Sequence, residues 1–142
     1  MDVIVSTAGF VRYFKNNPAV SGWAAIMRCG NQTKVLSEGG AWSTKERLLL
    51  TAVISVMKAL KKPCRVIVNT DSDTFRHNLA SAKELRANGW VTKTHAKLAT
   101  ADLWEKIAQL KEQGGHTLTV TKVYKETEDT KRCKEIIHYA EV

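Results

Sequence analysis

One stretch decides the fold: Val66-Ile67-Val68-Asn69-Thr70-Asp71-Ser72. Its first residues have strand character, a carboxylate follows, and the chain then becomes polar and helical. An apolar run stopped by a turn is typical of a buried parallel strand. Ligands of open α/β sheets bind at the carboxyl ends of strands, so Asp71 marks the place where a functional site is expected.

Three antiparallel strands are expected before this stretch. They are predicted at residues 3–7, 21–29 and 33–39. Gly30-Asn31 indicates a hairpin turn between the last two strands. Residues 8–17 are interpreted as a polar connection, which ends in the turn signal Asn16-Asn17-Pro18. The chain is therefore predicted to open with an antiparallel meander.

A long helix is expected between the meander and the central strand. Ser43-Thr44-Lys45-Glu46 matches a capping box, with Ser43 as the N-cap and Glu46 as its acidic partner. Apolar residues at helical spacing continue to Lys61 or Lys62, and Pro63 ends the helix. The broad apolar surface predicts that this helix is deeply buried against a sheet.

The second half of the chain is mostly helical. Helices are predicted at 73–79, 80–88 with Gly89 as a C-terminal stop, 101–113 and 131–141, with a strand at 116–124 and a basic segment without a clear period at 90–100. The resulting order is β-β-β-α-β-α-α-α-β-α. This order predicts an α/β fold with a mixed five-stranded sheet and helices on its faces.

Composition predicts a single globular domain over residues 1–142, with 44% hydrophobic and 25% charged residues. The sequence contains no run of about 18 apolar residues, so no membrane span is predicted. The acidic start Met1-Asp2-Val3 is unlike a signal peptide. The cysteines are few, odd in number and widely spaced: Cys29, Cys64 and Cys133. We interpret them as reduced, mostly buried thiols of a cytoplasmic protein, and we expect a monomer. The net charge of +8 favours a polyanionic partner.

The element order and several strings resemble type 1 (bacterial) ribonuclease H over essentially the whole chain. The matching strings are residues 17–26 (NPAVSGWAAI) and 59–72 (ALKKPCRVIVNTDS), with Gly89-Trp90, Asp102-Leu103-Trp104 and Lys131-Arg132-Cys133. Their collinearity predicts a ribonuclease H-like fold, in which three antiparallel strands are followed by two parallel ones. The resemblance implies hydrolysis of the RNA strand of an RNA/DNA hybrid by two Mg²⁺ ions held by four carboxylates.

Only one of those four carboxylates is expected here. The family positions fall on Thr7, Leu49, Asp71 and Lys134, and the family's loop histidine is also missing. Two divalent ions beside one carboxylate and one ammonium group are not neutralised. We therefore expect a dismantled catalytic centre and no cofactor. An alternative is that Lys134 pairs with Asp71 and holds the site together without chemistry.

A relocated metal site is the other alternative. Its candidate ligands are Asp71, Glu46, Glu128 and Asp129, with Mg²⁺ or Mn²⁺ as the cofactor. A competing interpretation is structural, because Glu46 would complete the capping box and acids near the start of the last helix suit a helix N-terminus.

Nucleic-acid contacts are implied at two places. The candidates are Thr44, Lys45 and Arg47 near the start of the long helix, and Lys83, Arg86, Trp90, Lys93 and Lys97 in a basic handle. The competing interpretation is an ordinary solvated surface. Trp42 and Trp104 are expected in or at the edge of the core. Three functions remain open: a non-catalytic nucleic-acid-binding domain, a pseudoenzyme that acts through a protein partner, and an active nuclease with relocated ligands.

Overall fold

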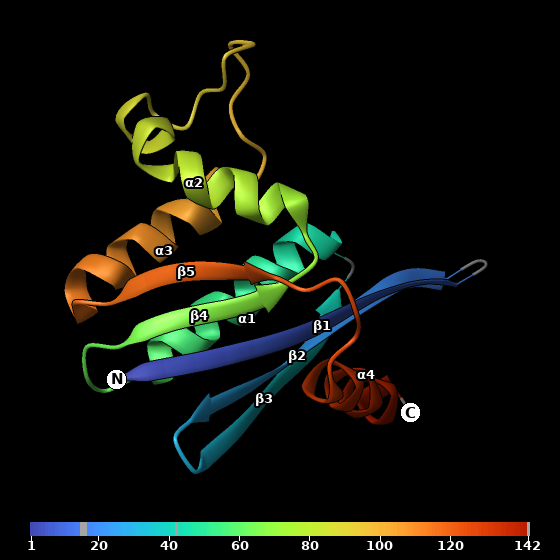
Figure 1. Cartoon of the computed structure of the whole chain (residues 1–142). Coiled ribbons are helices and arrows are strands. Elements are labelled where there is room, and N and C mark those ends of the chain that lie inside the picture. Colours follow the sequence, from blue (N-terminus) through green and yellow to red (C-terminus); the bar gives the residue numbers. More distant parts are fainter. Residues whose placement is uncertain (15–16, 42, 142) are drawn as a thin grey trace.

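The computed structural model describes residues 1–14, 17–41 and 43–141. Five strands form one mixed sheet in the order β3-β2-β1-β4-β5 (Figure 1). The elements are β1 (Asp2–Phe14), β2 (Asn17–Cys29), β3 (Gln32–Ala41), α1 (Lys45–Ala59), β4 (Arg65–Thr70), α2 (Asp73–Ala87), α3 (Ala101–Gly114), β5 (Thr117–Lys122) and α4 (Glu128–Glu141). β1, β2 and β3 pair in antiparallel fashion, and β4 pairs in parallel with both β1 and β5. The predicted fold class is confirmed.

Several predicted boundaries were wrong. The antiparallel ladder of β1 and β2 runs through residues 8–14, which were predicted as a connection, because backbone hydrogen bonds continue from Ala8↔Ala24 to Phe14↔Asn17 whatever the polarity of the side chains. Asn16 lies outside the described residues, and Asn17 and Pro18 already belong to β2.

The helices also differ from the prediction. The two short helices predicted at 73–79 and 80–88 are one continuous helix, α2. Its predicted stop is confirmed, because Gly89 has a φ of +67°, a conformation that glycine adopts without strain. α1 ends at Ala59, earlier than predicted, and α4 begins at Glu128, three residues before the predicted start at Lys131.

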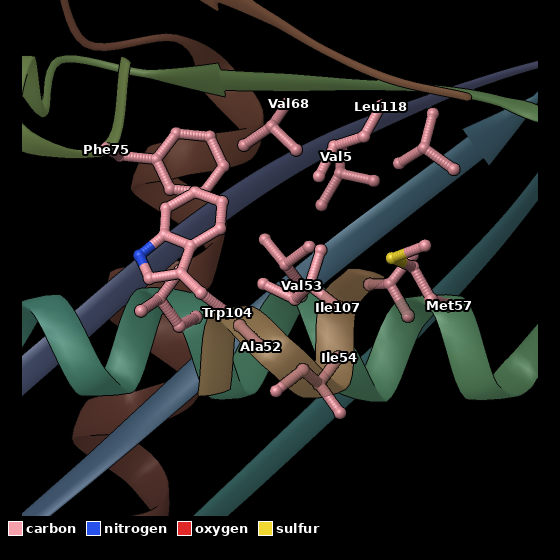
Figure 2. Close-up of a cluster of buried hydrophobic side chains, with 14 of the residues drawn as sticks. Val5, Ala52, Val53, Ile54, Met57, Val68, Phe75, Trp104, Ile107 and Leu118 are labelled. Carbon is pink, nitrogen blue, oxygen red and sulfur yellow. The ribbon is translucent and has the colours of Figure 1, made fainter. Parts of the chain in front are cut away.

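The main core fills the space between one face of the sheet and helices α1 and α3 (Figure 2). β4 alternates between fully buried and more accessible residues, and Val66 and Val68 point into this core. Trp104 is only 1% exposed and stacks on Phe75 with 5.4 Å between ring centroids. Its predicted core position is confirmed, whereas Trp42 lies outside the described residues.

A second, smaller cluster holds α4 against the sheet. Cys133 and Ile137 of α4 pack with Ala24 and Ile26 of β2, and all four are buried.

Cys64 and Cys133 are buried free thiols, and Cys29 is partly exposed, which agrees with the expected state of the cysteines. Among the described residues, no helix is both long and apolar enough to cross a bilayer. Helices thus flank the sheet, and the start of α4 lies beside the middle of β1 and the carboxyl end of β4.

Candidate functional site

A cavity of about 470 Å³ lies at the carboxyl end of β4, where the sequence placed the site. Its walls come from β1, the start of α1, the end of β4, the segment after β5, and α4. The cavity brings together all four residues that the resemblance places at the family's carboxylate positions: Thr7, Leu49, Asp71 and Lys134. Ala8 also lines the cavity. β1 therefore offers no acid there, whichever of its two residues is the family equivalent.

Asp71 follows the buried end of β4 and is exposed to solvent. Within the described part of the chain, its carboxylate has no hydrogen-bond or ion-pair partner. The next residue, Ser72, is the N-cap of α2, where its side chain accepts a hydrogen bond from the Phe75 amide at 3.1 Å. Asp71 is thus the free anionic group at the mouth of the cavity.

The predicted capping box at Ser43 was wrong, which changes the interpretation of Glu46. The N-cap of α1 is Thr44, whose Oγ1 accepts from the Arg47 amide at 3.2 Å. This one-residue shift places Arg47, not Glu46, at the third helical position. The Glu46 carboxylate instead reaches across the cavity wall, and its Oε2 accepts from Ser72 Oγ at 3.3 Å.

The surroundings of the Glu46 carboxyl group disfavour its charged form. Its side chain is half-buried, and its Oε1 is buried without a hydrogen-bond partner among the described residues. Burial raises the pKa of the Glu46 carboxyl, and the hydrogen bond from Ser72 only partly offsets this. Glu46 is the relocated-ligand candidate that the structure does bring beside Asp71.

The other two relocated-ligand candidates do not line the cavity. Asp129 binds Arg28 of β2 through two hydrogen bonds of 2.6 and 2.7 Å, which lower its pKa. Glu128 approaches Lys131 at 3.8 Å. Both acids belong to the first turn of α4, which favours the competing structural interpretation for them.

Lys134 does not pair with Asp71, so that hypothesis was wrong. Its ammonium lies 2.5 Å from Oε1 of Glu126, in the segment between β5 and α4. Glu126 also lines the cavity, although it was not among the four predicted metal ligands. Lys134 pairs with Glu126 because the two residues are close in the sequence, in the first turns of α4 and in the short loop before it. Asp71, in contrast, follows β4.

The two magnesium ions of the family do not fit these residues. Two hard cations need several convergent carboxylates, and the described residues contain no group of three or more His, Cys, Asp or Glu side chains arranged to hold a metal. Three lysines line the same cavity as the acids Glu46, Asp71 and Glu126, and Lys134 already pairs with Glu126. The lining therefore lacks the excess of carboxylates that two divalent cations require.

Of the eight predicted nucleic-acid residues, four make contacts within the fold: Thr44, Arg47, Arg86 and Trp90. Arg47 binds Asp102 of α3 through hydrogen bonds of 3.0 and 2.8 Å, which join α1 to α3. Arg86 of α2 binds Glu105 through two hydrogen bonds of 3.0 Å and also contacts Glu112. Trp90 is 6% exposed and donates its indole N–H to Glu105.

The remaining lysines stay available to a ligand. Lys45, Lys83, Lys93 and Lys97 are exposed and have no ion-pair partner in the described ranges. Thr44 is committed to capping α1. Sequence reasoning missed Lys125 as a cavity residue, and only its proximity to the end of the last strand could have indicated it.

This arrangement of sheet, helices and cavity defines a ribonuclease H-like α/β domain. The family model for RNase H matches residues 12–132. A ribonuclease H of Nitratidesulfovibrio vulgaris (strain Hildenborough) is 40% identical over 112 residues, which cover 77% of this chain and 69% of the relative. A ribonuclease H of Neisseria gonorrhoeae is 37% identical over 97 residues, covering 68% of this chain and 67% of the relative. The chain therefore belongs to the ribonuclease H family.

Solved structures agree on the fold. A foamy viral protease-reverse transcriptase in complex with dsDNA superimposes with a TM-score of 0.73 at 18% identity, over 94% of this chain and 92% of that chain. LC11-RNase H1 in complex with RNA/DNA hybrid superimposes with a TM-score of 0.70 at 17% identity, over 99% of both chains. At these identities the likeness shows the fold alone.

Proposed function

We propose that this chain is a ribonuclease H-family domain that binds RNA/DNA hybrid, or another duplex, without hydrolysing it. One observation carries the proposal: the cavity at the end of β4 presents Leu49 and Lys134 where the family's metal ligands are expected, and β1 offers only Thr7 and Ala8. Fold membership alone does not determine activity, because function depends on the residues of the site.

Electrostatics supports the loss of hydrolysis. At an effective dielectric constant of about 20, two unit charges about 4 Å apart interact by about 4 kcal/mol. Exchanging one carboxylate for the Lys134 ammonium turns one such attraction to a cation into a repulsion, and each magnesium ion carries two charges. A cavity with a cation at this position disfavours the paired metals that activate water and stabilise the leaving oxygen.

The proposal of nucleic-acid binding is supported by the net charge and by similarity to proteins that bind nucleic acid. The chain carries a net charge of +8, and its exposed lysines at positions 83, 93 and 97 lie on or after α2. Relatives of similar fold have been captured with RNA/DNA hybrid and with dsDNA. Phosphate contacts need only cations at suitable spacing, so they can persist when the metal ligands are gone.

A second candidate function is an active hybrid ribonuclease. It is favoured by the relatives named ribonuclease H and by Glu46, which lies on the same cavity as Asp71. In that case Asp71 and Glu46 would hold Mg²⁺ or Mn²⁺, which would supply an activated water. A pseudoenzyme that acts through a protein partner is the third outcome, and it predicts no affinity for nucleic acid.

One pair of assays separates these functions. The purified chain is titrated against a labelled RNA/DNA hybrid, a DNA duplex and an RNA duplex at two salt concentrations in EDTA. Phosphate-driven binding should weaken with salt, with a log–log slope of about −0.9 per contacted phosphate on duplex DNA. Absence of binding to every duplex at low salt would remove the proposed function and leave the protein-partner candidate.

The second assay incubates the same hybrid with Mg²⁺ or Mn²⁺ and looks for cleavage of the RNA strand. We expect none. Cleavage that disappears in Asp71→Asn would establish the active nuclease instead. Cleavage that persists in that variant would come from contaminating host enzyme, because a metal site in this cavity cannot lack its free carboxylate.

A further inference from the structure

We propose that the cavity at the end of β4 binds a backbone phosphate of the nucleic acid directly through lysine side chains, with no divalent ion between them. This inference rests on the proposed function and assigns a phosphate site to it. Three lysines from three separate segments line the cavity: Lys45 at the start of α1, Lys125 after β5 and Lys134 in α4.

Two of the three lysines that face the cavity are free to contact an anion. Glu126 is already engaged by Lys134 at 2.5 Å, and Glu46 is half-buried, which raises the pKa of its carboxyl. Lys45 and Lys125 have no ion-pair partner among the described residues. Among the described lining residues, Asp71 and Glu46 are the acids without an ion-pair partner, and Asp71 is the more exposed of the two.

Lys134 is placed to reach a phosphate without leaving Glu126. Its side chain is 63% exposed, so the ammonium lies at the open side of the cavity. An ammonium group has three N–H donors. One donor can stay on Glu126 while another binds a phosphate oxygen. A lysine at this position then supplies the positive charge that a metal supplies in a magnesium-dependent relative.

The backbone adds to the positive field of the side chains. α1, α2 and α4 all begin beside the cavity, because Lys45, Ser72 and Thr130 line it and belong to the first turns or caps of these helices. Each helix N-terminus carries a partial positive charge that favours anions. The cavity volume of about 470 Å³ is also ample for a phosphodiester group.

The test compares cavity variants with a matched lysine elsewhere. Hybrid affinity is measured in EDTA at several salt concentrations for wild type, Lys45→Ala, Lys134→Ala and the control Lys61→Ala, which is exposed just beyond the far end of α1. Each cavity variant should bind about tenfold more weakly at low salt, as expected for the loss of one charge-assisted hydrogen bond. Its salt slope should fall by about one phosphate contact, and the control should match wild type. Circular dichroism melts verify that every variant is folded.

The Asp71→Asn variant should change hybrid affinity in the opposite direction to the lysine variants. Direct lysine contact predicts tighter hybrid binding in this variant, because the exposed carboxylate that repels a phosphate is removed, and predicts that adding Mg²⁺ to wild type does not tighten binding. Weaker binding in Asp71→Asn, or tighter wild-type binding with Mg²⁺, would overturn the inference and indicate a metal bridge.

Two further outcomes separate the inference from the proposed function. If wild type binds hybrid but both cavity variants match Lys61→Ala, the cavity is not a phosphate site, and binding occurs elsewhere, for example at Lys83, Lys93 and Lys97. If wild type binds no duplex, the proposed function fails and the inference fails with it.

Discussion

Glu46→Gln should stabilise the protein at neutral pH, although it removes a charge that the sequence suggested as a helix cap. The Glu46 carboxyl is half-buried, its Oε1 has no partner in the described part of the chain, and burial raises its pKa above the ordinary value of 4.5. A folded state that raises the pKa of an acid binds its proton more tightly than the unfolded state does. The ionised carboxylate therefore costs stability once the pH rises above the ordinary pKa.

The size of the effect follows from the charge of the half-buried carboxylate. A buried group without its partners costs about 1–3 kcal/mol or more when it is charged, and the partial exposure of Glu46 reduces this to about 0.5–1 kcal/mol through solvent screening. Gln keeps an acceptor for Ser72 Oγ and places an equally unpaired amide nitrogen at the other position, so the gain comes from removing the charge. For a chain of this length, the gain corresponds to a rise in Tm of about 2–4 °C.

The measurement is a series of thermal melts between pH 4 and pH 8 for wild type, Glu46→Gln and the control Glu84→Gln on the exposed face of α2. The gain of Glu46→Gln should vanish near the ordinary pKa, grow as the pH rises through the raised pKa, and then level off. Glu84→Gln should show no such trend. A gain that does not depend on pH, or a loss at neutral pH, would refute the assignment of Glu46 as a half-buried, poorly solvated carboxylate.

The same melts test the relocated metal site. A ligand that binds only the folded state at a hundred times its dissociation constant stabilises it by about 2.7 kcal/mol. If Asp71 and Glu46 held Mg²⁺ with useful affinity, wild type would gain stability in Mg²⁺ and Glu46→Gln would not. We expect Mg²⁺ to leave the Tm of each protein unchanged.

Three other predictions follow from contacts in the fold. Lys134→Ala should change the free energy of unfolding by less than about 1 kcal/mol, because its pair with Glu126 is largely exposed; a larger loss in urea titrations would mean a deeper structural role. Lys83→Ala should weaken hybrid binding without lowering Tm, whereas Arg86→Ala should lower Tm, because Arg86 joins α2 to α3. The reverse pattern in parallel melts and titrations would mean that Lys83 stabilises the fold and Arg86 binds the hybrid. Cys133 should react with a thiol reagent at pH 8 at least about a hundredfold more slowly than a free thiol, because burial raises its pKa to about 11; rapid labelling of the native protein would contradict its burial between α4 and the sheet.

The central strand and its carboxylate could be predicted because their signal is local. Val66 and Val68 face a core and Asp71 ends the run, so burial and polarity change within a few residues. The same logic failed for residues 8–14, since an antiparallel ladder is stabilised by backbone pairing that polar side chains do not reveal. A strand can be predicted from its side-chain pattern where it is buried, and much less reliably where it extends beyond the core.

The site was harder to predict because its contacts join distant segments. A capping box at Ser43 and Glu46 and a simple cap at Thr44 differ by one residue, and only the backbone conformation of Thr44 distinguishes them. The partners of Arg47 and Arg86 lie on α3, more than ten residues away in sequence for each pair. No spacing rule predicts such pairs, because they depend on how α1, α2 and α3 pack.

The arginine pairs limit where the chain can hold phosphate. Arg47 and Arg86 each bind carboxylates on α3 through two hydrogen bonds, a geometry that competes directly with a phosphate. An incoming backbone would have to break these pairs and leave the α3 carboxylates without their partners. Lysines without a partner carry no such cost. The cavity and handle lysines without an ion-pair partner among the described residues lie at the end of β4 and along positions 83–97, so a duplex bound by this protein should contact both regions, and shortening the duplex until it spans only one should remove part of the salt dependence.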